Sequence, residues 1–148
     1  MNKDTDFLKR LLATFKVEAE EHITAMSSGL IELEKTAASE KQTEIIETIF
    51  REAHSLKGAA RSVNIVEIET VCQSLESIFS ALKRRDIPLS PELFNILHEA
   101  VDSLNNLLLS AGAIRTDSEK TLAKQIAKKL ENELKSFKEK VCFYLILP

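Results

Sequence analysis

The chain has 148 residues, enough for one domain with a buried core, and 44% of them are hydrophobic while 29% are charged. Three glycines and three prolines leave little material for loops, and with no tryptophan and one tyrosine the chain lacks the aromatic density of β-strands. The net charge is −3, the pI is about 5.7, and the basic residues are scattered, so we expect neither nucleic acid nor a membrane surface as a partner.

The N-terminal residues 1–6 lack the apolar segment of a signal peptide, and no window approaches the ~20 apolar residues of a membrane span. We therefore expect a cytoplasmic protein. Cys72 falls on an apolar helical face and Cys142 lies in the terminal run. Because the two cysteines are far apart and differ in setting, reduced thiols are expected rather than a disulfide.

Apolar residues recur every three or four positions over most of the chain, which is typical of amphipathic helices. Thr5 or Asp6 can cap the first helix. The second helix is predicted to stop at Asn64, since asparagine tolerates the left-handed conformation at a helix C-terminus. Ser90 followed by Pro91 predicts the start of the fourth helix.

A fifth helix is predicted after a capping box formed by Thr116 and Glu119. The predicted helices span about 6–34, 42–63, 66–85, 91–111 and 117–140. Short links between long amphipathic helices predict an all-α fold, an antiparallel up-down four-helix bundle with an additional C-terminal fifth helix. Residues 1–140 form the predicted domain. The apolar tail 141–148 could begin a further domain, dock on this one, or be an artificial extension.

The most informative stretch is 50–61, which carries His54 on the predicted second helix. At about 100° per residue, His54 lies beside the apolar stripe, on one shoulder with Lys57, Gly58 and Arg61. The imidazole should therefore be reachable from water, near two cations and next to a residue without a side chain. An exposed nucleophile with room for a partner is the first hypothesis.

The next helix is joined by the shortest link, so its polar shoulder with Gln73 and Glu76 can face His54. A carboxylate that accepts one imidazole N–H determines which ring nitrogen stays free, and Glu76 is the candidate acceptor. Lys57 could hold a phosphoryl group through charge-assisted hydrogen bonds, and Arg61 could add to the positive field. Residue types alone thus suggest an anionic group on His54, although an exposed histidine near cations is also a common surface feature.

The run from Phe50 to Ala60 closely resembles the phosphorylation-site helix of histidine-containing phosphotransfer domains, especially the N-terminal domain of the chemotaxis histidine kinase CheA and related hybrid kinases. The resemblance extends over about residues 7–109. It implies that His54 accepts a phosphoryl group on Nε2, that Lys57 supports it, and that Gly58 leaves space for a receiver domain.

On the facing helix, Glu76 matches the glutamate that bonds Nδ1 in that family, while Gln73 stands where some members have a second histidine. The resemblance further implies two partners, a histidine kinase catalytic domain and a response-regulator receiver domain. ATP and magnesium are expected on the kinase domain and no cofactor on this one. The chain is therefore expected to be a phosphoryl carrier in a two-component phosphorelay and not an enzyme by itself, within a parent histidine kinase.

Two alternatives to phosphotransfer are a metal-binding bundle and a non-catalytic bundle. A di-iron bundle would use Glu-x-x-His pairs, but Ala19, Arg51 and Asn95 stand three positions before the histidines, so no metal site is expected. The alternative function is a non-catalytic helical bundle that presents a face to a partner, with His54 incidental. His22 is expected to lie at the edge of the core and His98 at the surface.

Overall fold

The structure, a computed structural model, describes residues 3–111 and 117–146, with side chains described up to Glu139 in the last helix. Its five helices are α1 (Lys3–Lys35), α2 (Ser39–Ser62), α3 (Val66–Lys83), α4 (Pro91–Leu109) and α5 (Asp117–Ile146). Within the described ranges there is no strand. The predicted all-α class and the bundle with a fifth helix are confirmed.

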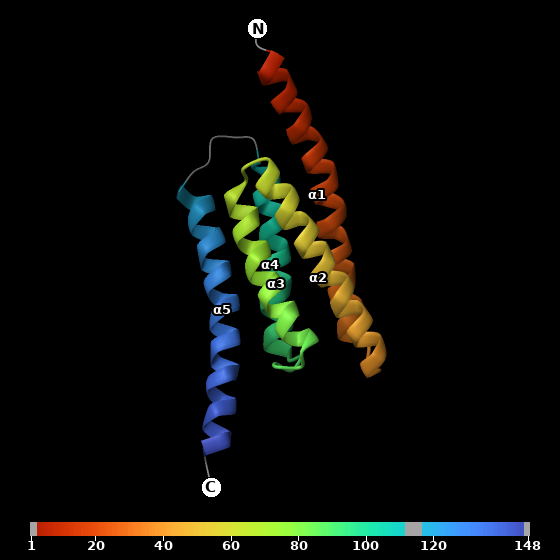
Figure 1. Ribbon diagram of the computed structural model, residues 1–148, viewed down its shortest axis with the longest axis vertical. Coiled ribbons are helices and arrows are strands. Elements are labelled where there is room, and N and C mark those ends of the chain that lie inside the picture. The colour runs from red at the N-terminus through yellow and green to blue at the C-terminus, as the bar shows by residue number, and fades with distance from the viewer. Residues whose placement is uncertain (1–2, 112–116, 147–148) are drawn as a thin grey trace.

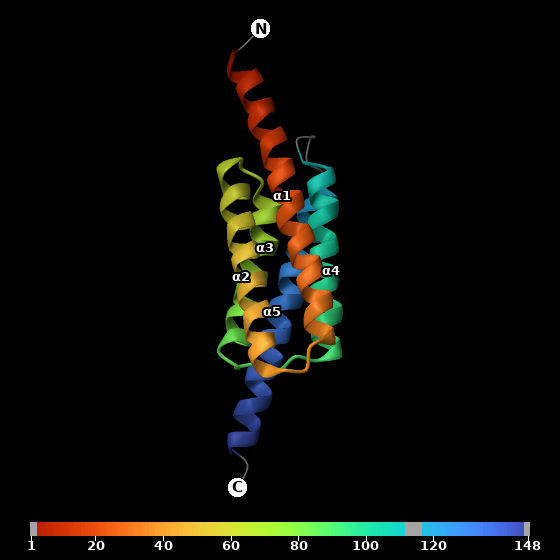
Figure 2. The ribbon, with the colours of Figure 1, turned by 90° about the vertical axis from the view of Figure 1, so that its right-hand side faces the viewer.

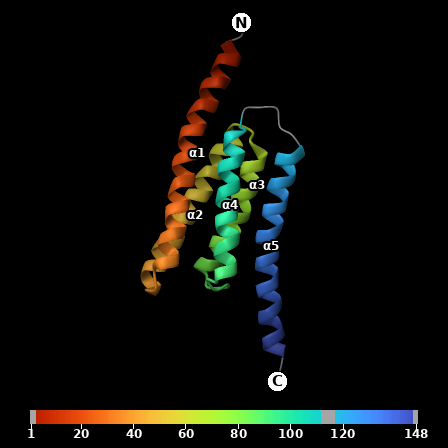
Figure 3. The same ribbon diagram turned by 180° about the vertical axis from the view of Figure 1, so that it is seen from behind.

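The first four helices form a closed antiparallel bundle, in which α1 packs on α2 and α4 while α3 packs on the same two helices from the other side. Figure 2 shows α1 in front, between α2 and α4. The fifth helix packs outside this bundle on α3 and α4, as Figure 3 shows from behind. Helix α3 therefore has neighbours on three sides.

One continuous hydrophobic core runs through the bundle and includes α5. The apolar stripe of α1 is buried from Phe15 onward, but Leu8, nearer the N-terminus on the same helix, is 61% exposed. The N-terminal turns of α1 extend beyond the other helices in Figure 1, so no other described helix lies beside them.

Glycine matters at the crossing of α1 and α2. A Cβ atom on Gly29 would lie 2.7 Å from Cγ1 of Ile49, which is fully buried. No real Cβ approaches another atom so closely. Gly29 therefore lets the two helix backbones approach at this point, although glycine lowers the helix propensity of α1.

The link between α2 and α3 contains Asn64, whose φ of 59° confirms the predicted left-handed residue. Ile65 N–H bonds Ala60 O at 2.9 Å, and Asn64 N–H bonds Arg61 O at 3.2 Å. These two bonds form a Schellman motif, with Ile65 returned to the core. This turn reverses the chain within a few residues and therefore sets α3 against α2.

Helix α3 ends in the same way, but at a residue that the sequence does not mark. Arg85 has φ of 62°, and Asp86 N–H bonds Ala81 O at 2.9 Å. The helix ends at Lys83, so its predicted extension to residue 85 is wrong. The two closing bonds of the motif compensate for the unfavourable conformation of arginine.

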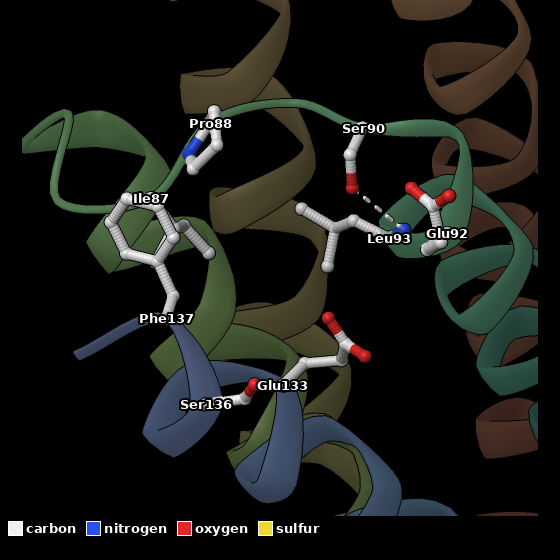
Figure 4. A pocket seen from close by; sticks show the side chains of 8 residues that line it. All are labelled: Ile87, Pro88, Ser90, Glu92, Leu93, Glu133, Ser136 and Phe137. Carbon is white, nitrogen blue, oxygen red and sulfur yellow. Dashed lines mark hydrogen bonds between the residues drawn. The ribbon is translucent and has the colours of Figure 1, made fainter. Parts of the chain in front are cut away.

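The start of α4 follows the prediction, because the Ser90 Oγ accepts the Leu93 N–H at 3.1 Å and Pro91 takes the first helical position. Figure 4 shows this cap beside a cavity that lies between the α3–α4 link and α5. The cavity has a volume of about 340 Å³. Phe137 of α5 lies there against Ile87 and Pro88 of the α3–α4 link. The cavity involves none of the residues around His54.

The remaining helix ends differ from the predictions or cannot be compared with them. Helix α1 begins at Lys3, so Thr5 and Asp6 lie inside it and do not cap it. Helix α5 continues past residue 140 to Ile146, since no proline or glycine interrupts it before Pro148. Gly112, expected to end the fourth helix, and Thr116 of the expected capping box lie outside the described residues, as do the side chains of the tail 141–148. No described helix has the length and apolar character needed to span a membrane.

Candidate functional site

The site lies along the antiparallel seam between α2 and α3. Four pairs of polar residues cross this seam in one antiparallel register. From one pair to the next, the residue number on α2 rises by as much as the residue number on α3 falls. In chain order along α2 the pairs are Glu47 with Lys83, His54 with Glu76, Lys57 with Gln73, and Arg61 with Glu69. The tight Schellman turn at Asn64 establishes this register.

His54 is exposed on the surface of α2, with 65% of its side chain accessible. Its Nδ1 atom is in hydrogen-bond contact with Glu76 Oε1. Because a carboxylate accepts, Nδ1 donates its N–H in this contact, and the lone pair of Nε2 is left free. In its neutral form the ring is therefore a nucleophile with one defined reactive nitrogen.

Glu76 is almost fully buried, with only 9% of its side chain accessible. Its second oxygen, Oε2, bonds the Lys57 ammonium, and Lys57 Nζ also donates to Gln73 Oε1 at 3.2 Å. A buried carboxylate is costly unless it is paired and hydrogen-bonded, and here both oxygens have a donor. The contacts of Lys57 with Glu76 and Gln73 use two of its three N–H donors, so one remains for another anion.

Gly58 lies one turn after His54 on α2. Apart from the backbone of its own helix, a Cβ atom on Gly58 would meet no heavy atom of the described residues within 4 Å. The glycine is thus not needed for packing within this chain, unlike Gly29. The space beside the imidazole on this side is open to a partner.

Arg61 lies further along the seam and its Nε bonds Glu69 Oε1 at 3.0 Å. Its partner is thus a glutamate of α3, and it makes no contact with His54. Sequence reasoning did not identify Glu69 as this partner. The constant spacing of the four pairs is the signal that would have identified it.

The other two histidines also contact glutamates of neighbouring helices. His22 Nδ1 lies 2.5 Å from Glu52 Oε2, and His98 Nε2 contacts Glu34. Their side chains are 26% and 36% accessible, so His22 lies at the edge of the core as predicted and His98 is partly exposed. Within the described residues, no lysine or arginine pairs with either glutamate.

Two further chemistries have little support in the described residues. No group of three or more histidine, cysteine or acidic side chains there is arranged to hold a metal ion. Cys72 is a free, buried thiol, and burial together with the charge of Glu76 raises its pKa. The thiol therefore stays protonated at neutral pH and is a poor nucleophile.

Sequence comparisons relate the chain to proteins of known type. The family model described as Hpt domain matches residues 10–107. The chemotaxis protein CheA of Cereibacter sphaeroides is 32% identical over 107 residues, which cover 72% of this chain and 15% of that protein. The CheA of Borreliella burgdorferi is 24% identical over 139 residues, or 94% of this chain and 14% of the relative.

The sensor histidine kinase CheAY of Helicobacter pylori is 23% identical over 105 residues, 71% of this chain and 13% of that kinase. The chain therefore spans only about 13 to 15% of the length of these curated relatives. The matched segment contains the whole seam between α2 and α3, with His54 near its centre.

Proposed function

The chain belongs to the Hpt domain family, whose members are histidine phosphotransfer domains, and on that premise we propose that His54 is its phosphoacceptor in a two-component phosphorelay. The observation that carries the proposal is the contact of His54 Nδ1 with the buried carboxylate of Glu76, which leaves Nε2 free and exposed. A carrier domain needs little more than this, because its partners supply the remaining chemistry.

In the proposed first step, Nε2 of His54 attacks the γ-phosphorus of ATP held with magnesium by a kinase domain. The N–P bond forms as the bond to the leaving oxygen of ADP breaks. The proton on Nδ1 stays on the ring, so the phosphorylated imidazole carries a positive charge. Glu76 faces that charge directly and stabilises it.

In the proposed second step, an aspartate oxygen of a receiver domain attacks the same phosphorus. The O–P bond forms, the N–P bond breaks, and the neutral imidazole is restored with Nδ1–H still bonded to Glu76. The free N–H of Lys57 can contact the phosphoryl oxygens in both steps. The open side at Gly58 gives a second protein access to the ring.

The partners follow from the same premise and remain proposals. The relatives are named as chemotaxis proteins and a sensor histidine kinase, so the proposed donor is a CheA-type kinase domain and the proposed acceptor is a response-regulator receiver. ATP and magnesium would bind the kinase domain and no cofactor this one. The use of ATP implies a reaction in the cytoplasm. A kinase of this type is also the proposed parent protein, in which this chain is the phosphoryl carrier.

The test is incubation of the chain with a purified CheA-type kinase core and labelled ATP. We expect a label on the chain that is lost in acid and retained in base, as for a phosphohistidine, and that passes to an added receiver domain. A label that is stable in acid would contradict the proposal. Absence of label with several kinase cores would instead favour the alternative, a non-catalytic helical bundle that presents a face to a partner.

A further inference from the structure

One contact of the His54 ring is not used by the phosphoacceptor chemistry described above. The ring of Phe50, one turn earlier on α2, lies parallel to the imidazole, with 6.5 Å between ring centroids and 10° between ring planes. Aromatic rings favour such offset parallel arrangements at centroid distances of 4.5 to 7 Å. The imidazole therefore has an aromatic face on one side along the helix.

Phe50 is itself held in place from α3. Lys83 Nζ lies 4.9 Å from the Phe50 centroid, within the range of a cation–π contact. Lys83 is anchored by Glu47 Oε2 at 2.5 Å. The hydrogen bond from Lys83 lowers the pKa of Glu47 more than any other contact does. This carboxyl is therefore ionised at neutral pH.

The two sides of His54 along α2 are therefore different. The Phe50 side is filled by a ring that also packs against the hydrophobic core. On the other side, a Cβ atom on Gly58 would meet no side chain and no neighbouring element of the described chain within 4 Å. The hydrogen bond to Glu76 fixes one nitrogen, but a single bond leaves the ring free to rock about that nitrogen. A parallel aromatic face restricts this rocking.

We propose that Phe50, held by Lys83, is a positioning residue that keeps the ring plane of His54, and with it the Nε2 lone pair, directed toward an incoming phosphorus atom. This inference rests on the proposed function of His54. Its energetic basis is alignment, because a reaction between held groups is fastest when the attacking orbital already points along the new bond.

The test compares Phe50→Leu with two controls, Phe50→Tyr, which keeps the ring face, and Phe94→Leu. Phe94 is another partly buried phenylalanine that packs against the core, but it lies on α4 and has no contact with His54. For Phe50→Leu we expect the kcat for phosphorylation by a kinase core to fall about 2- to 10-fold, with KM unchanged. This range corresponds to the interaction free energy of one aromatic pair. Both controls should keep the wild-type kcat.

A second readout is independent of turnover. NMR relaxation of the ¹³C-labelled His54 ring should show larger fast motions in Phe50→Leu than in the wild type, Phe50→Tyr or Phe94→Leu. If the wild type is phosphorylated but Phe50→Leu matches Phe94→Leu in kcat and ring motion, the positioning role is wrong and the proposed function stands. If the wild type takes up no phosphate, the proposed function itself fails.

The part of Lys83 is tested by a double-mutant cycle with Lys83→Met, which removes the cation and keeps most of the stem. Lys83→Met should lower kcat less than Phe50→Leu does, and it should cause no further loss when Phe50 is already leucine. An equal loss in both backgrounds would show that Lys83 acts without Phe50 and would overturn this part of the inference.

Discussion

Helix α2 takes part in two histidine–glutamate contacts, one on each side, and the two contacts differ in their surroundings. Toward α3, its His54 contacts Glu76, and toward α1, its Glu52 contacts His22. In both cases Nδ1 contacts the carboxylate and Nε2 takes no part in the contact. The contact that fixes the tautomer is thus present twice, and it does not by itself distinguish a phosphoacceptor.

The surroundings make the distinction. The side chain of His54 is 65% accessible, against 26% for His22, so a phosphorus atom can reach its Nε2 more easily. Glu76 is buried and shared with Lys57, whereas Glu52 is 28% accessible and has no cation of the described chain beside it. In the proposed function, an exposed ring, a buried carboxylate and an adjacent cation together distinguish His54 from His22.

The largest expected effect comes from removing each histidine in turn. His54→Gln should abolish phosphorylation by a kinase core, because it removes the proposed nucleophile. His22→Gln and His98→Gln should leave the rate unchanged, because the wild-type rings at these positions are less exposed than His54 and their glutamates are not shared with a cation of the described chain. The measurement is the initial rate of label uptake from ATP. Full labelling of His54→Gln would mean that the comparison between the two sides of α2 is wrong.

The next largest effect is expected at the carboxylates. Glu76→Gln keeps the shape but removes the charge that faces the phosphorylated ring, and a hydrogen bond to a charged group contributes about 1.5–3 kcal/mol, so the rate should fall about 10- to 100-fold. Glu52→Gln is the matched control on the other side of α2 and should react at the wild-type rate. Circular dichroism should show unchanged helix content in both variants. Equal rates for the two would remove Glu76 from the site.

The open side of the site is tested with Gly58→Leu. Leucine is a good helix former, so the fold should persist. Its side chain would fill the space beside the imidazole and hold the receiver domain away from its productive position. Transfer to the receiver should therefore slow about 10- to 100-fold. The rate of transfer from the purified phosphorylated domain measures this effect. Transfer at the wild-type rate would refute the steric function of Gly58.

The smallest expected effects are on stability, at the two glycines. Gly58→Ala should raise the free energy of unfolding by about 0.5–1 kcal/mol, because it gains helix propensity and meets no neighbouring atom. Gly29→Ala should lower it by about 1 kcal/mol or more, since the new Cβ would collide with buried Ile49. Urea denaturation measures both changes. A shift of the same sign in the two variants would contradict the assigned difference between the two helix faces.

Much of the fold and of the candidate site could be predicted from the sequence, because it follows from the local periodicity of the helices. The position of His54 on a shoulder of α2, the left-handed Asn64 and the contact with Glu76 all depend on helix geometry and one short link. The helix caps at Ser90 and Pro91 are likewise local features.

The remaining features depend on how whole helices match one another in space. The exposure of Leu8 follows from the length of α1 relative to its neighbours, which its own stripe does not reveal. The left-handed Arg85 depends on the closing bonds of the turn rather than on residue preference. The partners of Arg61 and Phe50 lie on α3, and they become visible only when the register of the seam is known.

The central claim is that Nε2 of His54 carries the phosphoryl group while Nδ1 stays bonded to Glu76. Its most direct test is NMR of the phosphorylated domain with ¹⁵N-labelled histidine, which reports which ring nitrogen is coupled to phosphorus. We expect coupling at one histidine only, His54, at Nε2, and a proton retained on Nδ1. Coupling at Nδ1 of His54, or at a nitrogen of His22 or His98, would contradict the claim.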